Sequence, residues 1–155
     1  MNNHFYLTSI TVLIVTGLFM ITKNTPLGIR NNNAGNIRAT GNWQEWQGAI
    51  DENKGFIVFD EPENGLRAMA RVLRTYRDIY GLNTIQSIIT RWAPPNENDT
   101  QSYINSAASI TGLSPVEPLA VYDYPLLMAA IVRHENGQQP YSSEQIQTGF
   151  ERGFA

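Results

Sequence analysis

The hydrophobic positions divide the chain into an apolar amino-terminal run and a longer part with helical periodicity. Residues 5–22 carry no charged side chain, and Lys23 and a helix-breaking Asn24-Thr25-Pro26 sequence follow them. A helix that rises about 1.5 Å per residue would nearly cross a hydrocarbon core of about 30 Å over this length. The pattern therefore predicts one transmembrane helix in residues 1–23. No basic region precedes it and no clear cleavage site follows it, which favours a retained signal-anchor.

The part of the chain after Asp60 is predicted to be mainly helical. Leu66, Met69 and Leu73 recur at helical spacing, in a helix that begins near Asp60 and stops at Gly81. Further helices are predicted over residues 84–92, from Asn98 or Asp99 to Gly112, from about Asp123 to residues 135–137, and from Ser142 or Ser143 onward.

Two segments between the apolar run and the helices have a different character. Residues 24–35 are rich in asparagine, glycine and proline, which suits either a linker or an ordered Asn-rich loop. Aromatic and β-branched residues then follow Gly55, which predicts a small β-hairpin. We expect an α+β, mainly helical fold in three parts, which are an anchor (1–23), the linker or loop (24–35) and one domain (36–155).

Composition limits the chemistry that this domain can perform. The net charge of −3 gives no basic field for nucleic acid. The chain has no cysteine, and its two histidines, His4 and His134, lie far apart in the sequence. We therefore expect neither a metal nor another cofactor.

Glu135 is the side chain most suited to acid catalysis. It follows the apolar residues 126–132 and lies just before Gly137, at the carboxyl end of a predicted helix. The negative end of the helix dipole and apolar neighbours both disfavour an ionised carboxylate. A protonated carboxyl group is what glycosidic-bond cleavage requires of its general acid. The alternative, which the local sequence alone favours, is a solvated glutamate at a helix end.

Several segments resemble the flagellar-type glucosaminidases of the lysozyme superfamily. Residues 36–43 (NIRATGNW), with Trp46 and Gly48, are similar to the asparagine-tryptophan region of those enzymes. Residues 55–60 (GFIVFD) resemble the strand that follows it. Residues 99–104 (DTQSYI) resemble the segment that supplies an active-site tyrosine, here Tyr103.

The catalytic helix of that family lies upstream of the asparagine motif, but this chain has no glutamate before Asn36. Residues 130–137 (AIVRHENG) look like that helix, displaced toward the carboxyl terminus. A circular permutation would account for both observations, because neighbouring chain ends can be relocated without changing a packed core. The resemblance thus implies a permuted lysozyme-like domain in which Glu135 faces Asn36 and Tyr103.

The chain also resembles a group of small phage proteins. The segments that carry this resemblance are residues 28–38 (GIRNNNAGNIR), 91–103 (RWAPPNENDTQSY) and 134–142 (HENGQQPYS). They are specific as a set, although Ala34 stands where the group has proline. The resemblance implies a phage origin.

These resemblances imply roles for individual residues. Glu135 would protonate the glycosidic oxygen, and Tyr103 would stabilise the positively charged transition state or position the attacking group. The alternative for Tyr103 is packing in the core. The residues expected to bind substrate are Asn36, Arg38, Trp43, Trp92 and Asn98, although asparagine and arginine could brace a turn and tryptophan could belong to the core.

The expected function is cleavage of peptidoglycan glycan strands, by a muramidase or a lytic transglycosylase of the endolysin type. The partners are then bacterial peptidoglycan and, through residues 5–22, a membrane. The expected location is the host inner membrane with the domain in the periplasm, or alternatively the virion. A virion structural or wall-binding protein without catalysis is the alternative function.

One further pattern belongs to neither motif set. Arg67, Arg71, Arg74 and Arg77 form a basic stripe on the helix that follows Asp60. Such a stripe could meet anionic wall polymer or lipid headgroups, but an ordinary solvated helix face is the favoured interpretation.

Overall fold

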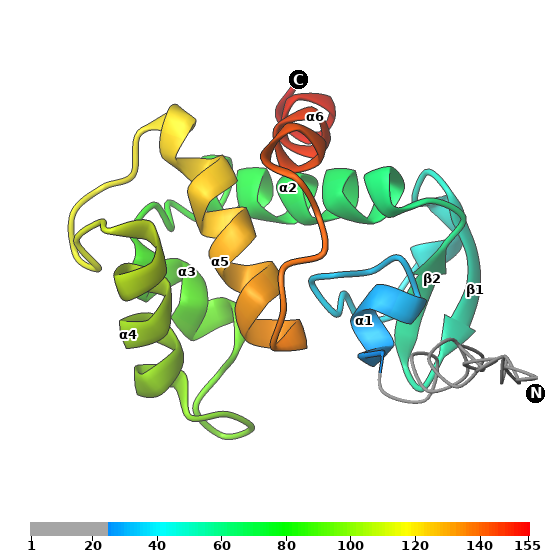
Figure 1. Cartoon of the computed structure of the whole chain (residues 1–155), viewed down its shortest axis with the longest axis horizontal. Helices are drawn as coiled ribbons and strands as arrows, with labels where there is room; N and C mark the ends of the chain where they lie inside the picture. The colour runs from blue at the N-terminus through cyan, green and yellow to red at the C-terminus, as the bar shows by residue number, and fades with distance from the viewer. Residues whose placement is uncertain (1–24) are drawn as a thin grey trace, which may run out of the picture.

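The computed structural model describes residues 25–155, which form an α+β, mainly helical fold with one small antiparallel hairpin (Figure 1). This confirms the predicted fold class at that level. The elements are α1 (Leu27–Arg30), a 3₁₀ turn (Trp43–Glu45), β1 (Ala49–Asn53), β2 (Phe56–Phe59), α2 (Pro62–Asp78), α3 (Ile85–Trp92), α4 (Thr100–Thr111), a second 3₁₀ turn (Val121–Asp123), α5 (Tyr124–Asn136) and α6 (Ser143–Phe154).

The predicted membrane anchor, residues 5–22, lies outside the described residues. Among residues 25–155, no helix combines the length and the apolar character that a bilayer crossing needs.

The hairpin forms through a two-residue turn. Lys54 and Gly55 both have positive φ, of 55° and 83°, which matches the turn geometry that suits the right-handed twist of paired strands. The strands pair in antiparallel register, with Asn53 opposite Phe56 and an irregularity between Ala49 and Asp51. The inner face of β2 places Ile57 and Phe59 in a small apolar cluster with Ala68 of α2.

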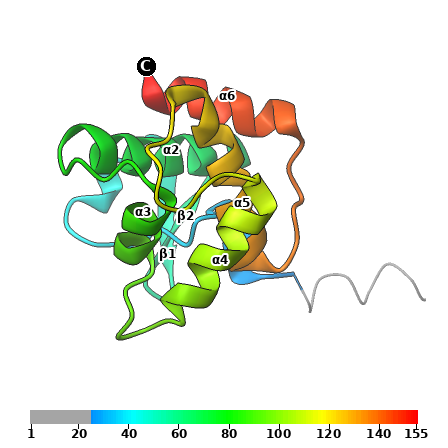
Figure 2. The ribbon, with the colours of Figure 1, turned by 90° about the vertical axis from the view of Figure 1, so that its left-hand side faces the viewer.

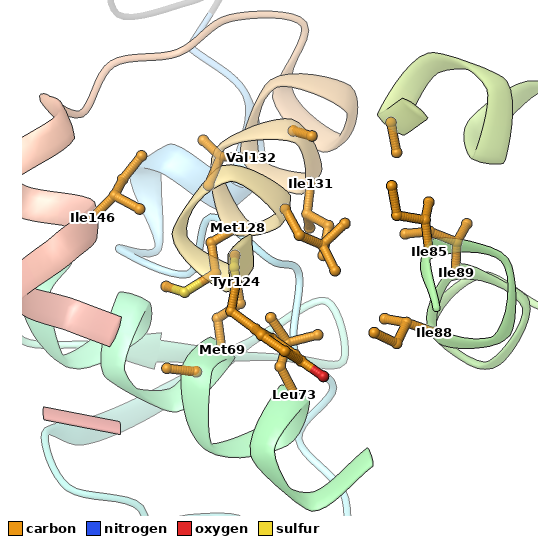
Figure 3. Close-up of a cluster of buried hydrophobic side chains, with 14 of the residues drawn as sticks. Met69, Leu73, Ile85, Ile88, Ile89, Tyr124, Met128, Ile131, Val132 and Ile146 are labelled. Carbon is orange, nitrogen blue, oxygen red and sulfur yellow. The ribbon is translucent and has the colours of Figure 1, made fainter. Parts of the chain in front are cut away.

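Helix α5 is at the centre of the main core. It lies between α3 and α4 on one side and α1 with the hairpin on the other (Figure 1), and Figure 2 views the molecule from the α3 and α4 side. The buried face of α5 meets side chains from α2, α3 and α6 (Figure 3). The residues that Figure 3 labels are Met69, Leu73, Ile85, Ile88, Ile89, Tyr124, Met128, Ile131, Val132 and Ile146, all of them buried.

Glycines allow α6 to cross α2 at close range. A Cβ atom built on Gly149 would lie 2.5 Å from the Cβ atom of Leu66, and one on Gly153 would lie 2.4 Å from that of Ala70. Both distances are shorter than real side chains allow, so the crossing in Figure 1 requires glycine at these two positions.

The helix ends lie close to the predicted ones because local capping groups set them. The Thr84 hydroxyl and the Asp99 carboxylate accept hydrogen bonds from backbone N–H groups at the starts of α3 and α4. Gly112 and Gly137 end α4 and α5 in the left-handed conformation. The exception is α2, which ends at Asp78 rather than at Gly81.

Residues 31–36, which follow α1, form an ordered Asn-rich loop. Asn31 and Asn33 are buried, with exposed fractions of 2% and 0%. The Asn33 amide donates to the backbone carbonyls of Ile37 (2.9 Å) and Ile57 (2.8 Å), and it accepts from the Ile37 N–H. The asparagine side chains thus replace missing backbone partners and attach the loop to β2.

Candidate active site

The carboxylate of Glu135 is held by one donor on each oxygen. The Tyr103 hydroxyl donates to Oε1 at 2.9 Å, and the Asn36 amide donates to Oε2 at 2.8 Å. The three residues come from α5, α4 and the end of the Asn-rich loop. The structure therefore brings together the three side chains that the sequence placed around one site.

The neighbouring residue fixes the end of α5 against the loop. The Asn136 amide is buried and donates to the carbonyl oxygens of Ala34 (2.8 Å) and Val132 (2.9 Å). A Cβ atom on Gly28 would lie 2.7 Å from both the Asn136 and the Asn36 side-chain oxygens, so glycine is needed there. This packing determines where the Glu135 side chain begins and limits its freedom to move.

Tyr103 is both a core residue and a donor to the site. Its ring is only 3% exposed and is stacked on the His134 imidazole, with 3.5 Å between ring centroids and 14° between planes. Burial, together with the nearby Glu135 carboxylate, raises the pKa of Tyr103 well above its ordinary value. The phenol therefore remains protonated and keeps donating to Glu135.

Glu135 lies where two hollows meet. The larger one, a groove of about 610 Å³, runs between the Asn-rich loop, the hairpin, α2 and α3. The smaller one, of about 290 Å³, lies against the start of α4 and is lined by Ser102, Tyr103 and His134. Glu135 and Asn98 line both hollows. An extended molecule could therefore occupy space on both sides of the carboxylate.

Four of the five residues predicted to bind substrate line the groove, and these are Asn36, Arg38, Trp92 and Asn98. Arg38 crosses to Glu97 in an exposed ion pair of 2.9 Å. Trp43 does not line the groove. Both Trp43 and Trp46 pack against the small cluster of Ile57, Phe59 and Ala68, and of the two only Trp46 also lines the groove.

Two residues that received no individual role also line the groove. Tyr76 and Arg91 lie together, with the Arg91 guanidinium carbon 5.3 Å from the Tyr76 ring centroid. Tyr76 also makes an edge-to-face contact with Trp92, at 6.3 Å between centroids. Arg91 belongs to the segment 91–103 that carried the phage resemblance, and this was the one sequence signal that pointed to it.

The other carboxylates near the site already have partners. Glu97 lines the groove but pairs with Arg38, and Asp99 lines the smaller hollow but caps α4 by accepting from the Ser102 N–H at 3.0 Å. Asp60, which lines neither hollow, accepts from the Asn64 amide at 2.8 Å. Within residues 25–155, no three histidine or carboxylate side chains gather in a way that could hold a metal ion.

The chain belongs to a family of bacteriophage proteins, which confirms the predicted phage origin. It is similar to Protein P5 of Pseudoalteromonas phage PM2, to which it is 40% identical over 154 residues, covering 97% of this chain and 96% of the relative. No protein-family model matches the chain.

Proposed function

We propose that this phage protein cleaves the glycan strands of bacterial peptidoglycan, with Glu135 as its single general acid and base. The observation that carries the proposal is the carboxylate at the junction of two hollows, held on both oxygens by Tyr103 and Asn36. A cleavable polymer needs a proton donor between two binding regions, and this arrangement supplies one.

The proposed reaction begins with Glu135 in its acid form. Its proton moves to the glycosidic oxygen as the bond to the sugar carbon breaks, which leaves positive charge on the sugar ring and a Glu135 carboxylate. That carboxylate then takes a proton from the attacking hydroxyl group and returns to the acid form. Tyr103 and Asn36 fix the carboxyl plane during both steps, because each holds one oxygen.

The walls of the groove suit a sugar polymer. Trp46, Tyr76 and Trp92 bring aromatic surface to it, and Asn36, Arg38 and Asn98 add amide and guanidinium donors. A sugar ring with equatorial hydroxyl groups can contact both flat apolar rings and fixed polar groups. The smaller hollow beyond Glu135 would take the residue on the other side of the cleaved bond.

A lytic transglycosylase is the form of the reaction that the local chemistry favours. Retaining and inverting glycosidases use two carboxyl groups about 5 to 9.5 Å apart. Here Glu97 and Asp99 are engaged by Arg38 and by the α4 backbone. In a transglycosylase the substrate's own 6-hydroxyl group attacks, so one glutamate is sufficient. Mass spectrometry of released muropeptides distinguishes an anhydro product from a reducing end and identifies the bond that is cut.

A permuted lysozyme-like fold is part of this proposal. In support, the glutamate-bearing end of α5 lies against the asparagine motif, although Asn36 and Glu135 are 99 positions apart in the chain. Here the motif comes first and the catalytic helix later, the reverse of their order in the flagellar-type glucosaminidases.

A zymogram with bacterial wall material tests the activity. We expect the parent protein to clear the wall and Glu135→Gln to lose at least about 100-fold of that activity, because general acid catalysis contributes about this much or more. Glu144→Gln, at an exposed position on α6, is the matched control and should clear normally. Equal clearing by the parent and Glu135→Gln would reject the assignment, and absence of clearing by both would favour a wall-binding or structural role.

The place of action is proposed as the periplasmic side of the host inner membrane, through residues 5–22, with the virion as the alternative. Immunoblotting distinguishes these two locations. A signal in membranes of infected cells but not in purified particles supports the anchored enzyme, and a signal in particles supports a role at entry.

A further inference from the structure

The basic stripe on α2 separates into two halves with different surroundings. Arg74 and Arg77 both form ion pairs with Asp78, at 3.3 and 3.4 Å. Arg67 and Arg71 instead line a recess of about 660 Å³ beside the groove. The half of the stripe formed by Arg67 and Arg71 therefore borders a recess, although Arg71 itself is exposed.

The recess is both cationic and aromatic. Arg91 reaches it from α3, with its guanidinium carbon 4.2 Å from the ring centroid of Tyr80, which also lines the recess. Trp46 contributes a further aromatic ring. Guanidinium groups beside flat rings form sites in which carboxylates can be bound by paired hydrogen bonds.

The three arginines that line the recess outnumber its one carboxylate among the described residues. Within residues 25–155, none of Arg67, Arg71 and Arg91 forms an ion pair with a carboxylate. Burial and the neighbouring Arg71 and Arg152 charges lower the pKa of Arg67. The one acidic residue in the lining, Glu45, accepts a hydrogen bond from the Asn42 amide at 3.1 Å. A bound anion would relieve this repulsion.

The recess adjoins the groove that leads to Glu135. Trp46, Val72, Tyr76 and Arg91 line both of them. We propose that the Arg67-Arg71-Arg91 recess binds the carboxylate groups of a stem peptide, while the glycan strand that carries this peptide lies in the groove. This inference rests on the proposed function for the occupant of the groove. A concave site that adjoins the groove fits a branch of the same polymer better than it fits the flat surface of a bilayer.

Binding to insoluble wall sacculi tests this inference without requiring catalysis. Glu135→Gln protein is sedimented with untreated sacculi and with sacculi whose carboxyl groups have been amidated by a carbodiimide, which keeps the glycan and the peptide but removes the negative charge. We expect binding to untreated sacculi to be about 10-fold tighter, because charge-assisted hydrogen bonds are lost on amidation. Adding Arg67→Gln and Arg71→Gln should remove this difference.

Two further variants and a folding control accompany this measurement. Arg74→Gln with Arg77→Gln removes the same charge from the other half of the stripe and should leave the difference unchanged. Glu45→Gln removes the negative charge in the recess and should increase the difference. Circular dichroism melting identifies any variant that fails to fold, and in that case the single substitution Arg71→Gln, at an exposed position, replaces the pair.

Two outcomes would overturn the inference. One is equal binding to untreated and amidated sacculi. The other is a difference that persists in Arg67→Gln/Arg71→Gln. Loss of binding to phosphatidylglycerol vesicles by the same variant would then assign these arginines to a membrane surface. The test is independent of the enzymatic proposal. Absence of clearing by the parent protein rejects catalysis but leaves the binding difference measurable, and normal clearing with no difference rejects the recess alone.

Discussion

A hydrogen bond of 2.8 Å joins the amide of Asn36 to the carboxylate of Glu135, two residues that lie 99 positions apart. A left-handed backbone conformation occurs at Asn36 itself and close to Glu135. Asn36 has a positive φ of 50°, and Glu135 lies two residues before the left-handed Gly137 that ends α5. The contact therefore depends on the backbone conformation at both places. A substitution that alters either conformation should change the geometry of the candidate site.

Removal of the Tyr103 hydroxyl should lower activity with little effect on stability. Tyr103→Phe keeps the ring stacked on His134 but deprives the Glu135 Oε1 atom of its donor. A lost hydrogen bond to a charged group corresponds to a fall in kcat of about 10- to 100-fold. The measurement is kcat and KM on soluble glycan strands, with Tyr141→Phe as a buried control outside both hollows. Full activity in Tyr103→Phe would leave Tyr103 as a packing residue alone.

Substitutions at Asn36 should separate backbone strain from chemistry. Asn36→Gly keeps the positive φ without strain but removes the amide that holds Glu135. Asn36→Ala removes the same amide and also places a residue with a Cβ atom at the positive φ, which adds strain. A left-handed backbone costs a non-glycine residue about 1 to 2 kcal/mol, and asparagine less than most. We expect both variants to lose activity by about 10-fold, with Asn36→Ala melting at a lower temperature than Asn36→Gly. Equal melting temperatures would argue against strain at this position.

The protein should lose stability above about pH 10, the ordinary pKa of tyrosine. Burial raises the pKa of Tyr76, Tyr103, Tyr124 and Tyr141. In the unfolded chain these phenols release their protons near pH 10, while in the folded chain they retain them, so rising pH favours unfolding. Above pH 10, each phenol that keeps its proton only in the folded chain lowers the free energy of unfolding by about 1.4 kcal/mol per pH unit.

Melting temperatures between pH 8 and pH 11.5 check this prediction. We expect a nearly constant value at the lower end, a fall above pH 10, and a shallower fall in Tyr103→Phe. Tyr122→Phe, in which the replaced ring is 80% exposed, is the control. A melting temperature that does not fall above pH 10 would contradict the linkage.

The α2 and α6 crossing should not tolerate a methyl group. Gly153→Ala would gain about 1 kcal/mol of helix propensity, but its Cβ atom would lie 2.4 Å from that of Ala70 and 2.6 Å from the Arg67 carbonyl oxygen. Overpacking costs about 1 to 3 kcal/mol, so the net effect is destabilising. Thermal melting should show a decrease of several degrees, whereas Gln147→Ala on the exposed face of α6 should change little. An increase for Gly153→Ala would show that the helices can separate freely.

The sequence predicted the helices well because their ends depend on neighbouring residues. Thr84 bonds to the N–H of Ser87, and Gly112 and Gly137 adopt conformations that other residues avoid. The grouping of Asn36, Tyr103 and Glu135 was predictable through family resemblance, since no local rule connects residues so distant in the chain.

The structural features that the sequence did not predict depend on contacts between segments that lie far apart in the chain. The partners of Asn33 include Ile57, 24 positions away, so composition alone could not separate an ordered loop from a linker. The spacing of Arg67 and Arg71 indicated a basic helix face. It could not show that Trp46 and Tyr80 line the same recess as these arginines. In the same way, the sequence could not show that Trp46 lines the groove and Trp43 does not, although both pack against the small cluster.

The position of the Asn-rich loop also determines when the site can form during translation. Residues 28–36 leave the ribosome early, yet the Ala34 carbonyl and the Asn36 amide find their partners on Asn136 and Glu135. Nascent chains that have not yet reached α5 lack the acid and its support together. For the proposed activity, a chain that has not yet been synthesised as far as Glu135 and Asn136 would therefore be inactive.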